Sequence, residues 1–140
     1  DNVSTPVYYN TIDYVTIASA GNATDFGDLS IGRRFVAGCS SSTRGLFAGG
    51  QEDVAGLVNT IEYITIASAG NATDFGDLIE KKSYIAACAS PTRGVFGGGN
   101  GATNVIQYVT IASTGNATDF GDLLQAAYGA AGASNCHGGI

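Results

Sequence analysis

Hydrophobic positions in this chain follow the two-residue period of β-strands. In residues 61–67, Ile61 and Tyr63 project to one side of the predicted strand, while Ile64 and Ile66 project to the other. A strand that is apolar on both sides must be covered on both, as in a sheet packed between two others. No stretch shows a sustained helical period with capping residues. The pattern therefore predicts an all-β protein.

Each such strand belongs to an expected unit of four. Residues 35–50 and 84–99 share a block in which a Ser-Ser-Thr or Ser-Pro-Thr turn separates two short strands, and glycines end the second strand. A turn rich in Gly, Asn, Asp and Thr follows residues 61–67 and leads to a short outer strand near Phe75 and Leu78. The unit is thus a hairpin, a third strand and an outer strand.

The unit recurs along the chain. The tract TIASAGNATDFGDL occupies residues 16–29 and 65–78, and it returns at residues 110–123 with Thr114 in place of Ala. Tandem four-stranded units of about 40–50 residues are typical of β-propeller blades. We therefore predict a propeller-like array of four-stranded antiparallel blades, with about three repeats.

The repeats begin in the middle of a unit. We predict a half-blade at 1–34, repeats at 35–83 and 84–127, and a second half-blade at 128–140. Three blades are fewer than the usual four to eight, so one chain is not expected to close a ring. Another copy would complete the half-blades, giving a ring or a filament, or a longer chain would do so. The first residue is Asp and not Met, which fits a processed product or an excerpt.

The order of these motifs resembles the kelch repeat. The matching positions are the double glycines Gly49-Gly50 and Gly98-Gly99, the tyrosines Tyr63 and Tyr108, and Phe75 and Phe120 in place of the kelch tryptophan. The spacing between tyrosine and aromatic is longer here than in kelch repeats. The near-identical tandems are also similar to repeat arrays in virus-encoded structural proteins such as phage tail components. These resemblances imply a propeller and a role on a virion or extracellular surface.

Composition narrows the choice of partners. A net charge of −6 with six Lys and Arg leaves no basic surface for nucleic acid or anionic membranes. No segment approaches the roughly 20 apolar residues that span a bilayer. We expect a soluble, folded and turn-rich chain.

The cysteines and the single histidine are candidates for chemistry. Cys39 and Cys88 share one register within runs of small residues, so we predict buried small side chains, with a disulfide as the alternative; Cys136 lies elsewhere in its copy. The single histidine, His137, aligns with Arg44 and is interpreted as a surface turn residue rather than a catalytic base. Near-identical repeats argue against an individual catalytic site, so we predict no enzyme; a galactose-oxidase-like enzyme is the third hypothesis.

Arg44 and Arg93 are two of only six cations. They are expected either to pair with repeat carboxylates such as Asp25 and Asp74 of neighbouring blades, or to remain solvated at a turn.

The turn in each repeat gathers side-chain oxygen atoms, which Ca²⁺ accepts. The alternative, which we favour, is that these side chains bond nearby backbone groups in a structural turn. The positions are Asn22, Thr24, Asp25 and Asp28, with copies Asn71, Thr73, Asp74 and Asp77, and Asn116, Thr118, Asp119 and Asp122. The Asn-Ala-Thr triplets at Asn22, Asn71 and Asn116 are also N-glycosylation sequons.

The segments between the glycine pair and the third strand differ among copies, at residues 1–9, 51–58 and 100–103. Variable loops on a constant scaffold are where recognition usually resides, and unconstrained drift is the alternative. Candidate partner-binding residues are Tyr8, Tyr9, Gln51, Glu52, Asp53, Asn100 and Thr103. We predict a non-enzymatic structural and binding module that joins other copies, or neighbouring repeats of a longer chain, through shared blades. A surface protein or a glycan is a further candidate partner, and a carbohydrate-binding adhesin or lectin is the runner-up.

Overall fold

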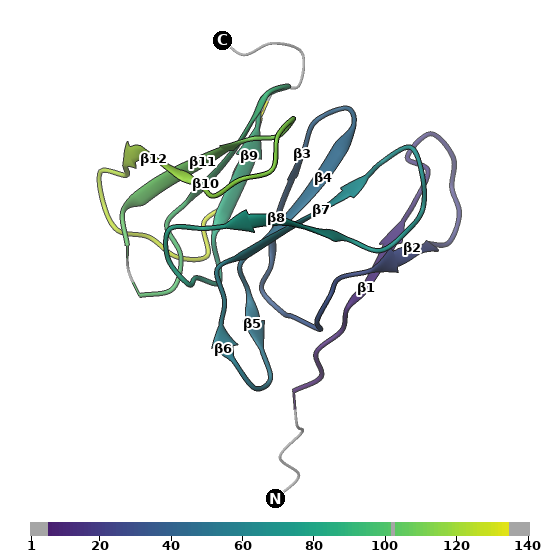
Figure 1. Cartoon of the computed structure of the whole chain (residues 1–140), viewed down its shortest axis with the longest axis horizontal. Coiled ribbons are helices and arrows are strands. Elements are labelled where there is room, and N and C mark those ends of the chain that lie inside the picture. The colour runs from purple at the N-terminus through teal and green to yellow at the C-terminus, as the bar shows by residue number, and fades with distance from the viewer. Residues whose placement is uncertain (1–5, 102, 135–140) are drawn as a thin grey trace, which may run out of the picture.

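The computed structural model describes residues 6–101 and 103–134. These residues form twelve β-strands and no helix. The strands make two four-stranded antiparallel sheets, a separate two-stranded sheet and a small hairpin (Figure 1). The predictions of an all-β fold and of four-stranded antiparallel units are therefore confirmed. The sheets do not close into a ring.

The first four-stranded sheet has the strand order expected of one repeat. Its strands are β3 (Ala37–Ser40), β4 (Arg44–Ala48), β7 (Thr60–Thr65) and β8 (Thr73–Asp77), hydrogen-bonded in that order. The hairpin turn falls at residues 41–43, where the Ser-Ser-Thr cluster predicted it. A bulge between Ile61 and Glu62 shifts the register against the outer strand β8.

The second four-stranded sheet repeats this arrangement. It consists of β9 (Ala86–Ala89), β10 (Arg93–Gly97), β11 (Val105–Thr110) and β12 (Thr118–Asp122), with the same order and an equivalent bulge. The predicted repeats at 35–83 and 84–127 each contain one of the two sheets.

The remaining strands precede the two four-stranded sheets in sequence or lie between the strands of the first one. The third and outer strands of the first copy, β1 (Thr11–Tyr14) and β2 (Thr24–Asp28), pair with each other. The strands β5 (Gln51–Glu52) and β6 (Gly56–Leu57) form a hairpin that was expected to be loop. Residues 128–134 contain no strand, and the rest of the predicted half-blade at 128–140 lies outside the described residues.

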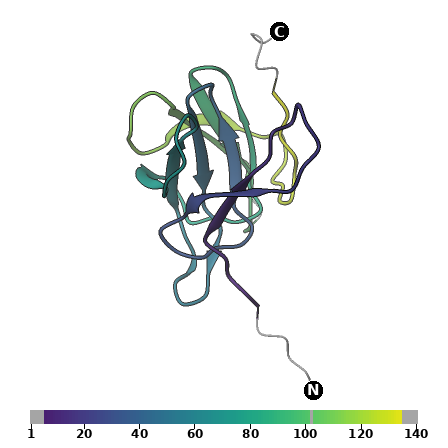
Figure 2. The same cartoon turned by 90° about the vertical axis from the view of Figure 1, so that its right-hand side faces the viewer.

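Both views place two of the variable segments at the same end of the molecule. The β5–β6 hairpin and the purple segment that leads into β1 lie at the lower end of the molecule, while the described yellow end of the chain leaves from the upper end (Figures 1 and 2). The hairpin turns after β3 and β9 are made of Ser, Thr and Pro residues and lie away from this lower end.

The hydrophobic core lies between the sheets. One cluster runs continuously from the first four-stranded sheet into the second and includes Leu46, Ile61, Phe75, Phe96 and Ile111, each at most 2% exposed. Burial of each such side chain contributes about 1.5–3 kcal/mol. A smaller cluster around Phe26 on β2 packs against the first four-stranded sheet. The strand β7 is therefore covered on both faces, as its pattern predicted.

The glycine pair closes each hairpin strand. Gly49 and Gly50 have positive φ angles of 63° and 107°, a region that favours glycine. A Cβ on Gly49 would also lie only 2.5 Å from the Lys82 carbonyl oxygen. The Gly50 N–H donates to that same carbonyl at 2.7 Å, so the pair joins the end of β4 to the segment that follows β8.

The part of the chain that the structure describes contains no helix long and apolar enough to cross a membrane.

Candidate functional site

The most strongly repeated geometry lies where one repeat meets the next. The loop between the third and outer strands of the first four-stranded sheet reaches the free edge of β2 in the preceding repeat. Gly70 N–H donates to the Phe26 carbonyl at 2.7 Å, and Ala72 N–H donates to the Asp28 carbonyl at 2.8 Å. We call this the loop–edge contact, meaning residues 69–72 or their equivalents against the outer edge of the preceding outer strand.

The next junction repeats the contact atom for atom. Gly115 N–H donates to the Phe75 carbonyl at 2.7 Å, and Ala117 N–H donates to the Asp77 carbonyl at 2.8 Å. Two independent copies with the same partners show that the contact is a property of the repeat.

The sequon asparagine completes the loop–edge contact. Asn71 Oδ1 accepts a hydrogen bond from the Asp28 N–H at 3.0 Å, and Asn116 Oδ1 accepts one from the Asp77 N–H at 3.0 Å. The favoured interpretation expected these side chains to bond nearby backbone groups within their own turn, and for Asn71 and Asn116 that was wrong in its location. The bonded backbone belongs to the preceding repeat and not to the asparagine's own turn.

The glycine in the Asp-Phe-Gly-Asp motif makes room for this loop. A Cβ on Gly27 would lie 2.3 Å from the Gly70 carbonyl oxygen, and one on Gly76 would lie 2.5 Å from that of Gly115. Neither distance leaves space for a side chain. The near-identity of the tract is thus explained by close packing between repeats.

The outermost repeats each present half of this contact. The outer-strand phenylalanine is 9% exposed at Phe26, 2% at Phe75 and 53% at Phe120. A Cβ on Gly121 would meet nothing within 4 Å, unlike its two copies. In residues 6–101 and 103–134, no segment makes the loop–edge contact with β12.

The other half lies at the opposite side of the molecule, beyond β1 and β2 (Figure 1). The residues Gly21, Asn22 and Ala23 form the first copy of the loop and are exposed. Ile17 is 97% exposed, whereas its third copy Ile111 is 1% exposed.

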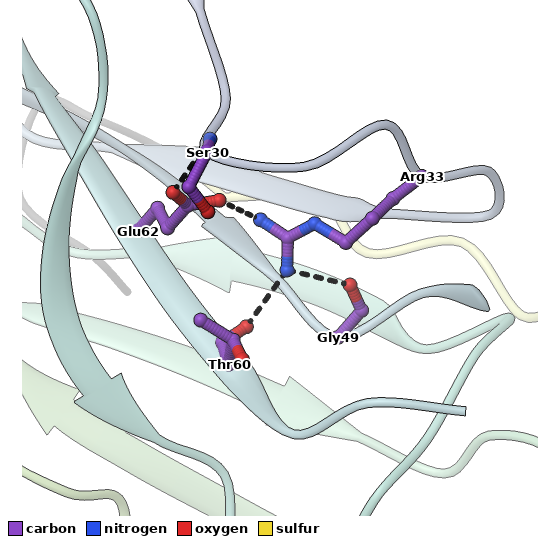
Figure 3. A network of polar contacts seen from close by, with 5 residues as sticks. All are labelled: Ser30, Arg33, Gly49, Thr60 and Glu62. Atoms are coloured by element: carbon purple, nitrogen blue, oxygen red, sulfur yellow. Dashed lines mark hydrogen bonds and ion pairs between the residues drawn. The ribbon is translucent and has the colours of Figure 1, made fainter. Parts of the chain in front are cut away.

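A buried ion pair strengthens the first junction (Figure 3). The Arg33 guanidinium pairs with Glu62 and donates to the Gly49 and Thr60 carbonyls, at 3.2 Å each, while Ser30 N–H donates to Glu62 Oε1 at 2.9 Å. Burial lowers the pKa of Arg33, and the charges of Glu62 and Glu52 act in the opposite direction. This pair was not predicted from the sequence, although Glu62 is a charged residue inside an apolar strand.

The second junction replaces the ion pair with a neutral acceptor. Gln107 stands where Glu62 stood, and its Oε1 accepts from the Ile79 N–H at 2.7 Å. Lys82 stands where Arg33 stood, and its Nζ turns to Glu80 at 2.9 Å and to the Asn100 carbonyl at 3.2 Å. The hydrogen bond to the junction backbone is retained, and the cation, now Lys82, pairs with the half-exposed Glu80 instead of a buried carboxylate.

Arg44 and Arg93, at equivalent positions of successive repeats, were expected either to pair with carboxylates or to remain solvated. Arg44 and Arg93 lie over the rings of Tyr63 and Tyr108, 4.5 and 4.8 Å from the ring centroids. Arg44 Nη1 also donates to the Ile111 carbonyl of the next repeat at 2.9 Å.

Of the two alternatives, the salt bridges from Arg44 or Arg93 to Asp25 or Asp74 are absent among the described residues, whereas Arg93 is exposed at its turn as the second alternative expected. Among the described residues the ion pairs are Arg33–Glu62 and Lys82–Glu80. The Arg44 guanidinium instead contacts the Tyr63 ring and the Ile111 carbonyl oxygen, and the Arg93 guanidinium contacts the Tyr108 ring. His137 lies outside the described residues.

Several of the predicted partner-binding residues come together. Tyr8, Glu52 and Asp53 line one pocket of about 500 Å³ at the lower end of the molecule. Arg34 lies 5.0 Å from the Tyr8 ring centroid and donates from Nη2 to Gln51 Oε1 at 3.1 Å. We call this surface, made of Tyr8, Arg34, Gln51, Glu52 and Asp53, the loop face.

The other predicted residues lie apart from the loop face. Asn100 lines a separate pocket of about 460 Å³ together with Tyr84 and Tyr128. Thr103 is half-buried and its Oγ1 accepts from the Val105 N–H at 3.3 Å, which is a local structural bond. Tyr9 is exposed, and its backbone carbonyl accepts from the Arg33 N–H.

A strained aromatic pair joins these two areas. Phe35 and Tyr84 occupy equivalent positions and stack with ring centroids 4.1 Å apart. Both have left-handed backbones, with φ of 59° and 56°, which costs an aromatic residue about 1–3 kcal/mol. Arg34 lies 5.0 Å from the Phe35 ring centroid as well. No periodicity in the sequence announced this pair, because it depends on two repeats lying side by side.

The first strands of the repeats line a hollow of about 700 Å³. Its walls come from β3, β9 and the segment 132–134, and they are mostly small residues. Cys39 and Cys88 lie here as free, half-buried thiols, so they are not joined to one another; Cys136 is outside the described residues. Burial, with a smaller effect from Cys88, raises the pKa of the Cys39 thiol to about 12.

No model of a known protein family matches the chain, and the comparison with curated proteins finds no match. Functional proposals therefore rest on the geometry described above.

Proposed function

We propose that the chain is a non-enzymatic structural module: a segment of a β-propeller-like array of kelch-type blades that joins neighbours through its open edges. The loop–edge contact carries this proposal, because it appears at both internal junctions and each end of the array presents one half of it. The near-identical tandems and their similarity in style to viral structural repeats favour a virion or extracellular assembly as its setting.

The arrangement of the sheets supports a propeller-like array. Each four-stranded sheet packs face to face with the next, and the first strands β3 and β9 lie side by side around the hollow. Radial packing of four-stranded sheets around a central space is the architecture of propellers.

The use of the most repeated residues supports a structural role. The Phe, Gly, Asn and Ala residues of the tract pack and form hydrogen bonds between repeats. Several variable residues, Tyr8, Gln51, Glu52 and Asp53, lie instead on the loop face. A stiff scaffold with changeable loops suits an assembly component better than a single catalytic pocket.

Light scattering across a concentration series tests the proposal. We expect the average mass to rise above that of one chain as concentration increases, and electron microscopy to show rings or filaments with one repeating spacing. A strictly monomeric chain at all accessible concentrations would contradict the proposal.

A second candidate function is carbohydrate binding, and one pocket favours it. The rings of Tyr84 and Tyr128 border the pocket beside Asn100, which joins apolar faces to an amide in a concave site. A glycan array with the wild type and a Tyr128→Ala variant tests this. Tyr128 is 71% exposed, so its loss should leave the fold intact. Absence of binding by the wild type would remove this candidate.

A further inference from the structure

We infer that the exposed edge of β12 captures the residue 21–23 loop of a second copy of this chain, so that copies associate head to tail. The inference rests on the proposed structural role and specifies the partner, the atoms and the polarity of that association.

The edge offers the same groups as the two occupied edges. By equivalence with Phe75 and Asp77, the free groups of β12 are the Phe120 carbonyl, the Asp122 N–H and the Asp122 carbonyl. A row of unpaired backbone groups on a strand edge is a template for pairing with another segment. The open space above Gly121 is where the backbone of an incoming loop fits, as it does above Gly27 and Gly76.

The loop offers the complementary groups. In a docked copy, Gly21 N–H donates to the Phe120 carbonyl and Ala23 N–H donates to the Asp122 carbonyl. Asn22 Oδ1 accepts from the Asp122 N–H. The sequence of this loop, Ala-Gly-Asn-Ala-Thr, is identical to that of the loop which occupies the edge of β2. No new recognition chemistry is needed.

Apolar packing adds to the hydrogen bonds. Ala72 packs against the cluster that contains Phe26, and Ala117 packs against the one that contains Phe75. In the docked pair, Ala23 takes this position against Phe120. Phe120 is 53% exposed, whereas its copies Phe26 and Phe75 are 9% and 2% exposed. The docked loop of a second copy would cover this additional exposed surface.

The contact has a direction, because the loop and the edge are different surfaces on opposite sides of the molecule (Figure 1). Such a heterologous interface continues from copy to copy, closing into a ring when the rotation allows and otherwise extending into a filament.

A pair of charge-matched variants tests the inference. Ala23→Glu places a carboxylate where the docked alanine would lie against Phe120. Ala20→Glu adds the same charge nearby, at a position whose copies Ala69 and Thr114 stay exposed even in the occupied junctions. Sedimentation velocity across a concentration series is measured for both variants and the wild type, with circular dichroism to verify the fold.

We expect Ala23→Glu to remain monomeric and Ala20→Glu to associate like the wild type. Asn22→Ala, which loses one hydrogen bond, should weaken association about fivefold. If the wild type associates and Ala23→Glu does so equally, or if both glutamate variants lose association, this inference fails while the proposed function stands. If the wild type itself never associates, the proposed function fails.

Mixing two blocked chains tests the polarity. Phe120→Glu blocks the edge and keeps the loop, whereas Ala23→Glu blocks the loop and keeps the edge. Each chain then supplies the half that the other lacks, so the mixture should form a 1:1 complex that grows no further. A mixture that stays monomeric, or one that forms long assemblies, would overturn head-to-tail docking.

Discussion

Replacing Glu62 with glutamine removes the charge that faces a buried guanidinium. Arg33 and Glu62 have side chains only 1% and 2% exposed, so solvent cannot take over the lost pairing. Removing one partner of a buried pair costs about 3–5 kcal/mol. Arg33 keeps the Gly49 and Thr60 carbonyls as acceptors, and the new amide oxygen can still accept from the Ser30 N–H. We therefore expect the lower end of the range, about 3 kcal/mol.

Urea unfolding followed by far-ultraviolet circular dichroism measures this loss, since the chain has no tryptophan. Asp13 is the matched control, because it occupies the register of Glu62 in the first copy and is exposed. Asp13→Asn should change the free energy of unfolding by less than about 0.5 kcal/mol. A Glu62→Gln variant as stable as the Asp13→Asn variant would refute the reasoning.

The second junction supplies the compensating change. There a lysine and a glutamine replace the arginine and the glutamate, and the lysine contacts Glu80 and the Asn100 carbonyl instead of the glutamine. The double variant Arg33→Lys, Glu62→Gln should therefore be at least about 1 kcal/mol more stable than Glu62→Gln alone. If the double variant and Glu62→Gln were equally stable, the buried charge of Arg33 would not be what Glu62 compensates.

Three further predictions concern other parts of the molecule. Asn71→Ala should lower the free energy of unfolding by about 1 kcal/mol through loss of its bond to Asp28, whereas Asn22→Ala in the monomer should change it by less than about 0.5 kcal/mol; equal effects in urea unfolding would contradict the loop–edge contact. Because the pKa of Cys39 is raised from 9.0 to about 12, its thiolate fraction at neutral pH is about 1000-fold lower than that of an ordinary thiol. Iodoacetamide should therefore label Cys39 far more slowly in the folded chain than in denaturant, as peptide mass spectrometry would measure, and labelling at equal rates would refute its burial. Association of the wild type should persist or strengthen when ionic strength rises, because the chain carries a net charge of −6 and the docked contacts are backbone and apolar; dissociation by salt in sedimentation would instead indicate a salt-bridged interface.

Much of the local structure was predictable from period and turn chemistry. The alternation around Ile61 and the Ser-Ser-Thr turn gave the strands β7, β3 and β4 close to their observed bounds. The outer strand β8 was found where Phe75 indicated it. The β5–β6 hairpin was missed because two-residue strands carry too few positions to show alternation.

The candidate sites were less predictable, because they join residues that are far apart in sequence. Arg44 was expected to pair with a carboxylate or to remain solvated, yet it lies over a tyrosine ring and donates to a carbonyl of the next repeat. The stack of Phe35 on Tyr84 and the ion pair of Arg33 with Glu62 likewise depend on neighbouring repeats. The spacing of residues within one repeat does not predict contacts between repeats.

The repeated tract separates what the sequence determines from what the tertiary structure decides. Its amino-acid sequence alone determines that three segments form the same turn and the same outer strand, because local propensity and turn chemistry act within a few residues. They do not determine that Asn71 is bonded across a junction while Asn22 is exposed, or that Phe75 is buried while Phe120 is not. Identical sequences acquire these different environments because burial and hydrogen bonding depend on which other segment lies beside them, and only the tertiary structure decides that.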